Sequence, residues 1–512
     1  MVLIKRRKIK GHVYLYVVRN YREKDKVKQK YIAYLGREDN LPNLLSEYAK
    51  LRNLTNSELE NLSYSAPLEL LKLANEIEIP KVFASHFKKE WGVDAGVAST
   101  LMILNYCFES KSKNKLSDWY EQTYLKHELK IPAKKINRDL LYHTLDLFSE
   151  EKIEKIHEEI FKKAKEKFNL SEDITTYDVT ALLFEGDNCS LAKRGYNAEA
   201  MYKFQANLGL AITNEKFPVA HKTFEGNIKD VTTFDKMIAL LNKTINLKNT
   251  IFIFDRGIFS EANKQKILSF GSKYISGFKK YPEIKGLIKS TKETDFKIAD
   301  KKTLFYEIIG EERKIIFWNK EMAEEQKVER EKRLKKIEEE LKKIDYKRYD
   351  EKRLYEKVGQ ITGKKRKCFE IDYKTFSIKR NEVTIKEMER LDGKSVLVTN
   401  TDLEAKDILK KYRDKNIVEM SFKDLKMFVD VRPIRHWKEK RVLAHIFLAV
   451  LAFGLRSLLE LKLRRAGLEI TAQESIEQLS RIRVLCAKGK ILRTTGETET
   501  TKEIQQVLSK KG

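Results

Sequence analysis

The stretch DITTYDVTALLFE, residues 173–185, is the first of three strand-like segments that follow one another along the chain. KFQANLGLAIT (203–213) and FPVAHKTFEG (217–226) complete the set, with polar connections between them. Short runs rich in β-branched and aromatic residues favour strands. Three such runs in succession predict an antiparallel meander.

A different pattern follows the meander. DVTTFDKMIALLNKTI (230–245) has helical periodicity, TIFIFDRG (250–257) is an apolar strand, a short helix should begin at Ser260, and YISGFK (274–279) is another strand. The order β-β-β-α-β-α-β is typical of a ribonuclease H-like layer, in which helices cover a mixed sheet. We therefore expect a multidomain α+β protein built around such a layer.

The segments on either side of this layer predict further domains. HVYLYVV (12–18) and VKQKYIAYL (27–35) indicate a basic N-terminal β-hairpin, and helical periodicity follows it. The expected division is 1–44 for the hairpin, 45–168 for a helical domain, 169–284 for the first part of the layer, 285–395 for an insertion, 396–463 for its second part and 464–512 for a C-terminal tail.

The insertion contains a highly charged helical segment at 319–357, in which positive and negative residues nearly cancel. From Leu334 to Ile344 apolar residues recur at spacings of 3, 4 and 3, as in a short coiled-coil seam. We expect one long helix or a helical hairpin here.

The whole chain is strongly basic. Its 512 residues include 103 Lys and Arg against 76 Asp and Glu, a net charge of +27. A polyanionic partner accounts for such an excess, and a charge-rich, thermophile-like surface is the alternative.

Several classes of protein are excluded by motifs that the sequence lacks. The cysteines, at 107, 189, 368 and 486, form no C-x-x-C pair, and the histidines form no H-x-x-x-H motif. The sequence therefore contains no recognisable zinc-binding motif. The glycine loops of nucleotide-binding folds are also missing. The longest nearly apolar run, 444–455, is shorter than the ~20 residues of a membrane span. We expect a soluble, cytoplasmic protein with reduced thiols and no membrane partner.

Two aspartates stand at strand positions where a charge is costly. Asp178 lies in the middle of the first strand, and Asp255 ends the apolar strand at 250–257. A carboxylate in either place needs a cation or a hydrogen-bond donor to meet it. Structural roles stay open for both: a satisfied core hydrogen bond for Asp178 and a turn cap for Asp255.

A third carboxylate belongs to a predicted helix over about 402–427. Four polar residues of this helix are spaced 3, 4 and 7 apart, and at about 100° per residue they fall within an arc of roughly 60°. A solvated face with i,i+4 ion pairs is the plainer explanation. The four residues are Tyr412, Lys415, Glu419 and Lys426.

Together these segments resemble the three catalytic blocks of DDE-type insertion-sequence transposases, in the subgroup marked by a Y-R-E-K signature. The blocks are TTYDVTALLF, FIFDRG and the pattern Y-x-x-K-x-x-x-E-x-x-x-x-x-x-K, in this order. Supporting segments also occur in the family order: YLGR, FEGNIKD, YISGFK and RPIRHWKEKRVLAHIFLAVLAF. Lys415 stands where the family usually has arginine. Lysine keeps the charge but loses the bidentate fork.

The resemblance implies a metal-dependent transposase in which Asp178, Asp255 and Glu419 are catalytic and hold two Mg²⁺ or Mn²⁺ ions. Hard oxygen ligands suit these ions, and two ions roughly 3.5 to 4 Å apart can activate the nucleophile and stabilise the leaving oxygen. A cut-and-paste route is implied as well. Water cuts one strand at each element end, the 3′ hydroxyl attacks the opposite strand to form a hairpin, and the reopened end joins target DNA.

The expected partners are double-stranded DNA, as the terminal inverted repeats of the element and as target, and a second copy of the chain. The resemblance places the protein in the cytoplasm of a prokaryote, near the nucleoid. End-specific recognition is expected within residues 1–168, which include the helical DNA-binding domain at 45–168, and lysine and arginine side chains should neutralise phosphates. A solvated surface is the alternative for each basic cluster.

On the helix of Glu419, Lys415 and Lys426 would meet phosphates as point charges and Tyr412 would donate its hydroxyl hydrogen. Trp318, in the insertion, is a candidate to stack on a base flipped out during hairpin formation, although a packed core tryptophan is the plainer reading. The other expected DNA contacts are Arg256, Lys134, Lys135, Arg138, Arg432, Arg435, Lys438 and Lys440.

Two other functions remain open. The first is a transposase-derived DNA-binding protein without catalysis, against which the presence of all three carboxylates argues. The second is another nuclease on a ribonuclease H-like fold, such as a resolvase. The long insertion and the Tyr-Lys-Glu-Lys helix have no obvious use in that enzyme.

Overall fold

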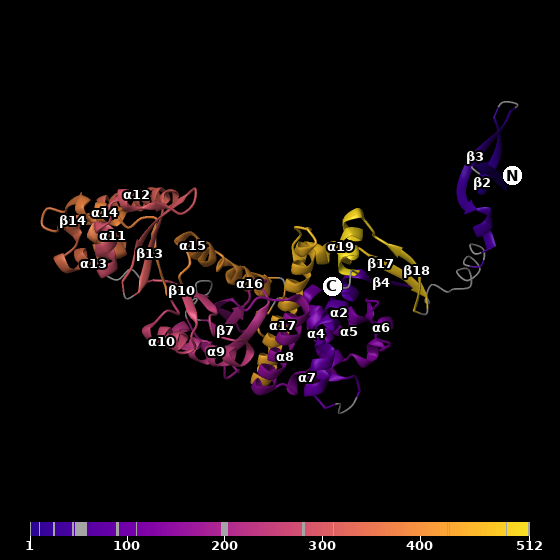
Figure 1. The fold of residues 1–512 in the computed structure, drawn as a ribbon. Helices are drawn as coiled ribbons and strands as arrows, with labels where there is room; N and C mark the ends of the chain where they lie inside the picture. The colour runs from indigo at the N-terminus through magenta and orange to yellow at the C-terminus, as the bar shows by residue number, and fades with distance from the viewer. Residues whose placement is uncertain are drawn as a thin grey trace.

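The computed structural model describes residues 2–9, 11–23, 26–42, 46, 59–88, 92–108, 110–195, 203–278, 282–310, 312–427, 429, 431–487 and 489–509. A mixed sheet lies between a helical domain and a long insertion (Figure 1). The boundary that we expected at 44/45 lies outside the described residues.

The central sheet has ten strands in the order β11-β12-β13-β16-β10-β9-β5-β7-β6, with β8 paired to β7. β5, β7 and β8 form an antiparallel meander, and β9 and β10 run parallel to β5. This confirms the ribonuclease H-like order expected from the sequence. The strands are β5 Ile174–Leu183, β6 Lys193–Arg194, β7 Phe204–Ile212, β8 Pro218–Glu225, β9 Ile251–Phe254, β10 Lys273–Gly277, β11 Lys297–Ile298, β12 Thr303–Ile308, β13 Arg313–Asn319 and β16 Lys394–Thr399.

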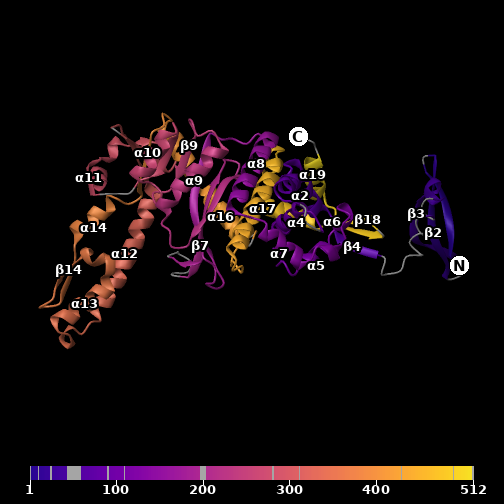
Figure 2. The same ribbon diagram turned by 90° about the horizontal axis from the view of Figure 1, so that it is seen from below.

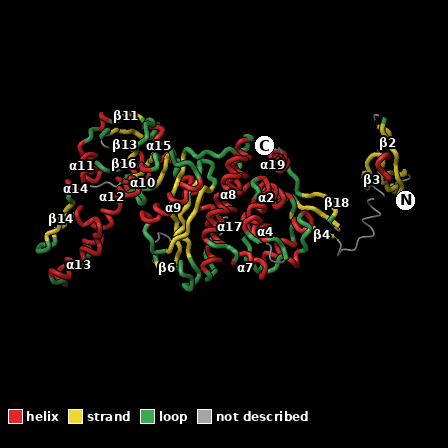
Figure 3. Tube along the Cα trace, turned by 60° about the horizontal axis from the view of Figure 1, so that its bottom comes forward, coloured by secondary structure: helices red, strands yellow, loops and turns green. Residues whose placement is uncertain are grey.

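Alternate residues of each strand point to opposite faces of the sheet and enter two separate cores. Phe252 and Phe254 of β9 pack with helices α9 and α17, whereas Ile253 packs with α15 on the other face. The views in Figures 1 and 3 show helices on both sides of these strands. The helices of the layer are α9 Asp230–Thr244, α10 Glu261–Ser269, α15 Ala405–Arg413, α16 Asn416–Met427 and α17 Glu439–Arg465.

Helix α17 is the central core helix, packed between the sheet and the helical domain. By length and composition it could cross a membrane, with a mean hydropathy of 2.1 over its apolar window, but 94% of that window is buried inside the protein. The apolar helix is thus longer than the run at 444–455 suggested. Its burial is that of a core helix.

The helical domain begins after strand β4 and packs against α17. The C-terminal residues, which we expected to be a tail, instead form two helices and two strands, and β17 pairs with β4. The elements are β4 Leu59–Ser63, α2 Ser65–Glu76, α3 Ile79–His86, α4 Ala95–Phe108, α5 Leu116–Glu121, α6 Leu125–Glu128, the 3-10 turn η3 Ala133–Lys135, α7 Arg138–Asp146, α8 Glu150–Phe168, α18 Ala472–Ser480, β17 Arg483–Ala487, β18 Lys490–Thr495 and α19 Glu499–Ser509.

The insertion projects from the sheet as a helical hairpin with a small β-hairpin beside it (Figure 2). It has hydrophobic clusters of its own, one around Leu334 and Phe369 and one around Leu341 and Leu354. Its two ends meet, because the backbone N–H of Asn319 donates to the carbonyl oxygen at position 393 at 2.9 Å. The elements are α12 Lys320–Lys342, η5 Tyr346–Arg348, α13 Glu351–Thr362, η6 Gly363–Cys368, β14 Phe369–Asp372, β15 Ser377–Arg380 and α14 Glu382–Glu389.

The projecting part is shorter than the predicted insertion at 285–395. Strands β11, β12 and β13 belong to the central sheet, where β13 pairs with β16. Alternating apolar residues in β13 explain this, because Ile315 and Phe317 enter one core and Ile316 the other. Helix α11 Pro282–Ser290 and turn η4 Glu293–Asp295 connect β10 to these strands.

The N-terminal segment is a three-stranded antiparallel sheet, β1-β2-β3, and not only a hairpin. The residues before the predicted hairpin are basic and form the additional strand β1, which pairs with β2 along its length. The elements are β1 Val2–Ile9, β2 His12–Glu23, β3 Lys26–Arg37 and η1 Glu38–Asn40.

Candidate active site

Asp178 and Asp255 lie side by side on two neighbouring parallel strands, Asp178 in the middle of β5 and Asp255 directly after the end of β9. In the β5–β9 register Thr176 is opposite Ile253, and each aspartate lies two residues further along its own strand. Because side chains alternate, both carboxylates face the side of the sheet on which Ile253 packs against α15. This is the face that Glu419 approaches.

Glu419 lies in the first turn of α16. The predicted single helix over 402–427 is in fact two, since α15 ends at Arg413 and α16 begins at Asn416. Hydrogen bonds of the tighter i→i+3 type cross the junction, from Lys415 N–H to the Tyr412 carbonyl at 3.2 Å. Lys415 therefore sits at the break, where its side chain turns into the site.

The ammonium group of Lys415 links two of the carboxylates. Its Nζ lies 3.2 Å from Oε1 of Glu419 and 3.8 Å from Oδ2 of Asp255. These two carboxylate oxygens are thus no more than 7.0 Å apart, the sum of the two distances. The Lys415 side chain is only 7% exposed, whereas that of Glu419 is 58% exposed. A buried cation is consequently held beside carboxylates that solvent can reach.

Asp178 is the most shielded of the three carboxylates. Burial raises its pKa to about 6, the Lys415 charge lowers it, and the charges of Asp255 and Glu419 raise it. Its Oδ1 accepts a hydrogen bond from the Val179 N–H at 2.9 Å. The structure thus brings the three predicted carboxylates close enough for their charges to act on one another.

The sequence analysis missed a fourth carboxylate, Asp230, at the start of α9. Burial and the nearby Asp255 charge both raise its pKa. The signal was available, because Asp230 ends the segment FEGNIKD that follows the meander. A helix start would bring this residue to the same edge of the sheet.

Tyr412 contacts a carboxylate of the site. Its hydroxyl group donates to Oδ1 of Asp255 at 3.4 Å, and burial followed by the Asp255 charge raises its pKa. A Cβ atom on Gly277 would lie 2.5 Å from this hydroxyl oxygen, so the glycine in YISGFK permits the close approach. The contact with Asp255 makes Tyr412 an orienting residue for this carboxylate, a role that the sequence analysis did not foresee.

A cavity of about 540 Å³ opens beside the carboxylates. Lys426 and Arg432 line it together with Asp230 and the part of β5 that follows Asp178. Two of the predicted DNA-contacting cations are therefore brought close to the carboxylates.

The remaining predicted cations are distributed over three regions. Arg256 is exposed next to Asp255, while Lys134, Lys135 and Arg138 are exposed on the helical domain, where Arg138 pairs with Asp139 at 3.1 Å. Arg435 and Lys438 belong to the loop that leads into α17, and Lys440 lies in the first turn of this helix. Arg435 pairs with Glu185 at 2.6 Å, Lys438 lies 5.6 Å from the centre of the Trp437 ring, and Lys440 is exposed.

Trp318 is already engaged by its neighbours. Its ring packs edge-on against Phe296 at 5.5 Å, and the ammonium groups of Lys394 and Lys320 lie 4.9 and 5.1 Å from its centre. This arrangement favours the packed tryptophan over a stacking residue. Among the tryptophans that the structure describes, the exposed one is Trp437, 63% exposed within RPIRHWKEK, which the sequence analysis quoted but did not single out.

The donor set at the sheet edge fits a hard divalent cation. All the ligands are carboxylate oxygens, they come from two adjacent strands and a helix start, and a cationic amine now balances their charge. Mg²⁺ and Mn²⁺ prefer such oxygen ligands. Asp178, Asp255 and Glu419 would hold the metal, with Asp230 close by.

Comparisons with known proteins give two family matches. Residues 169–455 match the family model of the transposase DDE domain, and residues 3–63 match that of the N-terminal domain of IS1634 family transposases. No curated protein matches the chain. A solved structure of the piggyBac transposase synaptic complex with hairpin DNA is similar over 81% of this chain and 79% of that one, with 10% identity and a TM-score of 0.44.

Proposed function

Because this chain belongs to the family of insertion-sequence transposases with a DDE domain, we propose that it cuts the ends of its element and joins them to target DNA. The proposed route is cut-and-paste through a hairpin intermediate, carried out by a homodimer that holds two ends. DDE transposase domains generally use divalent metal ions, and we propose two Mg²⁺ or Mn²⁺ ions here.

The convergence of the carboxylates on Lys415 carries this proposal. Asp178, Asp255 and Glu419 come from positions far apart in the chain, yet their charges act on one another and on one buried amine. Desolvating a carboxylate without a cation is costly, so such a cluster is expected where a cation must bind.

The three carboxylates would hold the metal ions, which when bound supply an activated water and stabilise the leaving 3′ oxygen. Tyr412 fixes the orientation of Asp255 through its hydroxyl group. Lys415 balances the carboxylate charges before metal arrives, and its amine can then turn to a neighbouring phosphate. Asp230 adds negative charge at the same edge.

The DNA backbone would follow the cavity that Lys426 and Arg432 line. Lysine and arginine there position phosphates without reading sequence. The loop containing Arg435, Trp437 and Lys438 continues from this cavity, because Ile434 bridges to Phe184 at the end of β5. An exposed aromatic ring among cations is the arrangement used to stack on unpaired bases.

The decisive experiment is a cleavage assay on labelled DNA carrying the terminal inverted repeat, with Mg²⁺, Mn²⁺ or EDTA. We expect metal-dependent nicking, then a hairpin that migrates slowly on a denaturing gel, and finally joining to a target plasmid. Asp255→Asn should remove all three products while retaining end binding in a gel shift. Glu215→Gln, a change in a loop between β7 and β8, is the matched control and should react as wild type.

The assay also separates the alternative functions. Binding without any metal-dependent nicking would support a catalytically inactive DNA-binding derivative. Nicking of branched or unrelated duplexes as efficiently as of the repeat would support a different nuclease on the same fold. Joining without a detectable hairpin would overturn only the hairpin step.

A further inference from the structure

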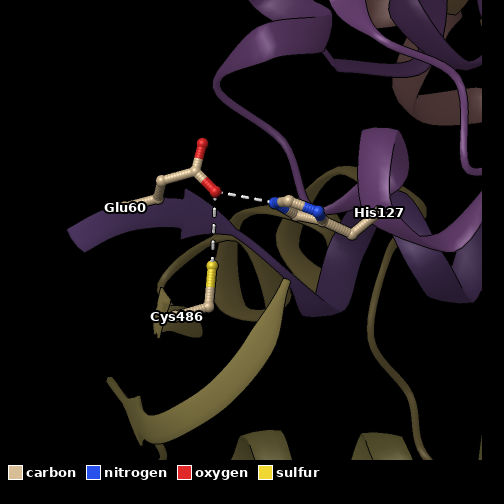
Figure 4. A group of neighbouring side chains, drawn as sticks. All are labelled: Glu60, His127 and Cys486. Atoms are coloured by element: carbon tan, nitrogen blue, oxygen red, sulfur yellow. Dashed lines mark hydrogen bonds and ion pairs between the residues drawn. The ribbon is translucent and has the colours of Figure 1, made fainter. Parts of the chain in front are cut away.

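A second group of potential metal ligands lies away from the carboxylate site, where the C-terminal strands meet the helical domain. Glu60 of β4, His127 of α6 and Cys486 of β17 each offer one ligand atom, and these atoms lie within 4.8 Å of one another (Figure 4). Among the residues that the structure describes, this is the one group of three such ligands at that spacing.

The backbone brings these side chains together. Glu60 and Cys486 are directly opposite in the antiparallel β4–β17 pair, so their side chains emerge on the same face of the sheet. His127 follows Tyr124, whose N–H donates to the Ser63 carbonyl of β4 at 2.9 Å. Ligands placed on strands and an anchored helix are held more closely than ligands on a free loop.

One oxygen atom of Glu60 faces both other ligands. Oε2 lies 2.7 Å from Nε2 of His127 and 3.8 Å from Sγ of Cys486. Lys126 pairs with the other oxygen, Oε1. The lysine therefore leaves Oε2 facing both Nε2 of His127 and Sγ of Cys486.

Solvent reaches two of the three ligand residues. The Glu60 side chain is 31% exposed and that of His127 is 25% exposed, which gives an ion a path from solvent. Cys486 is buried behind them.

The mixture of ligand atoms selects the metal. One oxygen, one imidazole nitrogen and one sulfur match the preferences of Zn²⁺, which binds at about 2.0 to 2.3 Å from such atoms in tetrahedral sites, whereas Mg²⁺ favours oxygen alone. We propose that Glu60, His127 and Cys486 bind one zinc ion, with water as the fourth ligand. The thiol proton leaves to solvent as the Zn–S bond forms, and the imidazole binds through Nε2 with its proton on Nδ1.

The ion would act as a structural clamp. β4 is the end of the region that matches the N-terminal family model, and β17 belongs to the C-terminal segment. A metal bond to both strands, and to helix α6 of the helical domain, would fix the point at which the N-terminal region enters the body of the protein. This role is independent of the carboxylate site.

The test uses untagged full-length protein in saturating Mg²⁺, with Co²⁺ as the spectroscopic probe and Zn²⁺ as its competitor. We expect one equivalent of Co²⁺ to give a near-ultraviolet thiolate-to-cobalt band that Zn²⁺ removes. Only a cysteine ligand gives this band, so occupation of the carboxylate site cannot imitate it. Cys486→Ser should abolish the band. Cys368→Ser, a change at a buried cysteine in the insertion, is the matched control and should keep it.

Two further measurements complete the test. His127→Ala should weaken zinc binding by more than about 100-fold, since losing even an outer partner costs about 10- to 100-fold. Zn²⁺ should raise the unfolding temperature of wild type and of Cys368→Ser but not that of Cys486→Ser. A missing thiolate band in wild type, or a band that survives in Cys486→Ser, would overturn the proposal and leave a hydrogen-bonded network around Glu60.

Discussion

The ammonium nitrogen of Lys415 lies 3.8 Å from a carboxylate oxygen of Asp255, although 160 residues separate them in the chain. The same nitrogen lies 3.2 Å from Glu419. A lysine that resemblance alone would assign to phosphate thus contacts the carboxylates directly. Its charge offsets their repulsion, and a divalent ion would compete for the same oxygens.

This relationship predicts a metal-dependent stability change. Lys415→Met keeps the length of the side chain but leaves the carboxylates without their cation, so the metal-free protein should lose about 1–2 kcal/mol of unfolding free energy. Saturating Mg²⁺ should restore most of this loss. Urea unfolding with and without Mg²⁺ measures it, with Lys411→Met, on the adjacent helix α15, as control. Equal destabilisation under both conditions would show that the amine does not balance the metal ligands.

Lys426 should affect DNA and not metal. It lines the cavity beside the carboxylates, so Lys426→Ala should weaken end binding and slow the processing of pre-nicked ends while leaving the Mg²⁺ dependence unchanged. Wild-type cleavage by Lys426→Ala would contradict a DNA-binding role for this face.

Lys415→Arg should be tolerated or improve activity, because the guanidinium restores the bidentate fork.

The two tryptophans should differ in a base-stacking assay. Trp437 is exposed, whereas the Trp318 ring is engaged by Phe296 and two lysines. With 2-aminopurine at the end of the repeat, Trp437→Ala should lose more fluorescence quenching and hairpin product than Trp318→Ala. Trp318→Ala should instead lower the unfolding temperature. A larger loss of quenching and of hairpin product in Trp318→Ala than in Trp437→Ala would show that Trp318 is the stacking residue.

The insertion should be removable without loss of the metal site. Since the N–H of Asn319 meets the carbonyl oxygen of residue 393, a linker of about five residues at ~3.5 Å each can replace residues 321–390. We expect the Mg²⁺-dependent stabilisation and first-strand nicking to persist, with hairpin formation or end pairing reduced. Replacing only 320–357 would break the cluster of Leu334 and Phe369 and is the less informative deletion. Undiminished transposition after the full excision would show that the insertion is only structural.

Acid stability should depend on a buried histidine pair. His157 and His221 face each other through their Nδ1 atoms at 2.9 Å, and burial lowers the pKa of His157 to about 4 and that of His221 well below its usual value. Below about pH 6.5 the two histidines bind protons in the unfolded chain but stay neutral in the folded protein. Stability is therefore present above pH 6.5 and falls towards pH 4, by roughly 1.4 kcal/mol per pH unit for each proton.

His221→Asn tests this dependence. Asparagine can still donate to the free Nδ1 of His157, whose Nε2 hydrogen points to the Pro218 carbonyl at 3.2 Å. The slope of unfolding free energy between pH 4.5 and 6 should fall by about one proton relative to wild type. His143→Asn, at a helix end away from the pair, should leave the slope unchanged. If the slope of unfolding free energy against pH is the same in His221→Asn as in wild type, His221 is already protonated in the folded protein.

The order of strands and helices in the catalytic layer could be predicted from the sequence because each element carries its own local period. Alternation marks the strands, and apolar residues at helical spacing mark the helices. Asp178 and Asp255 were recognisable for the same reason, since a charge within such a strand breaks its pattern. The edge strand β11 escaped prediction because its two residues are too few to show a period, and β12 lies in the segment that the sequence analysis assigned to the insertion.

Other features were decided only by tertiary packing. The break between α15 and α16 arises where Lys415 turns towards Asp255. The spacing of apolar residues along a helix does not predict a contact with a residue 160 positions away in the chain. The meeting of Glu60, His127 and Cys486 depends on β17 pairing with β4. The sequence by itself determined which residues could form each strand and helix, because that choice depends on near neighbours. Which strands and helices meet was decided by the burial of distant apolar faces against one another, and this brought the ligands together.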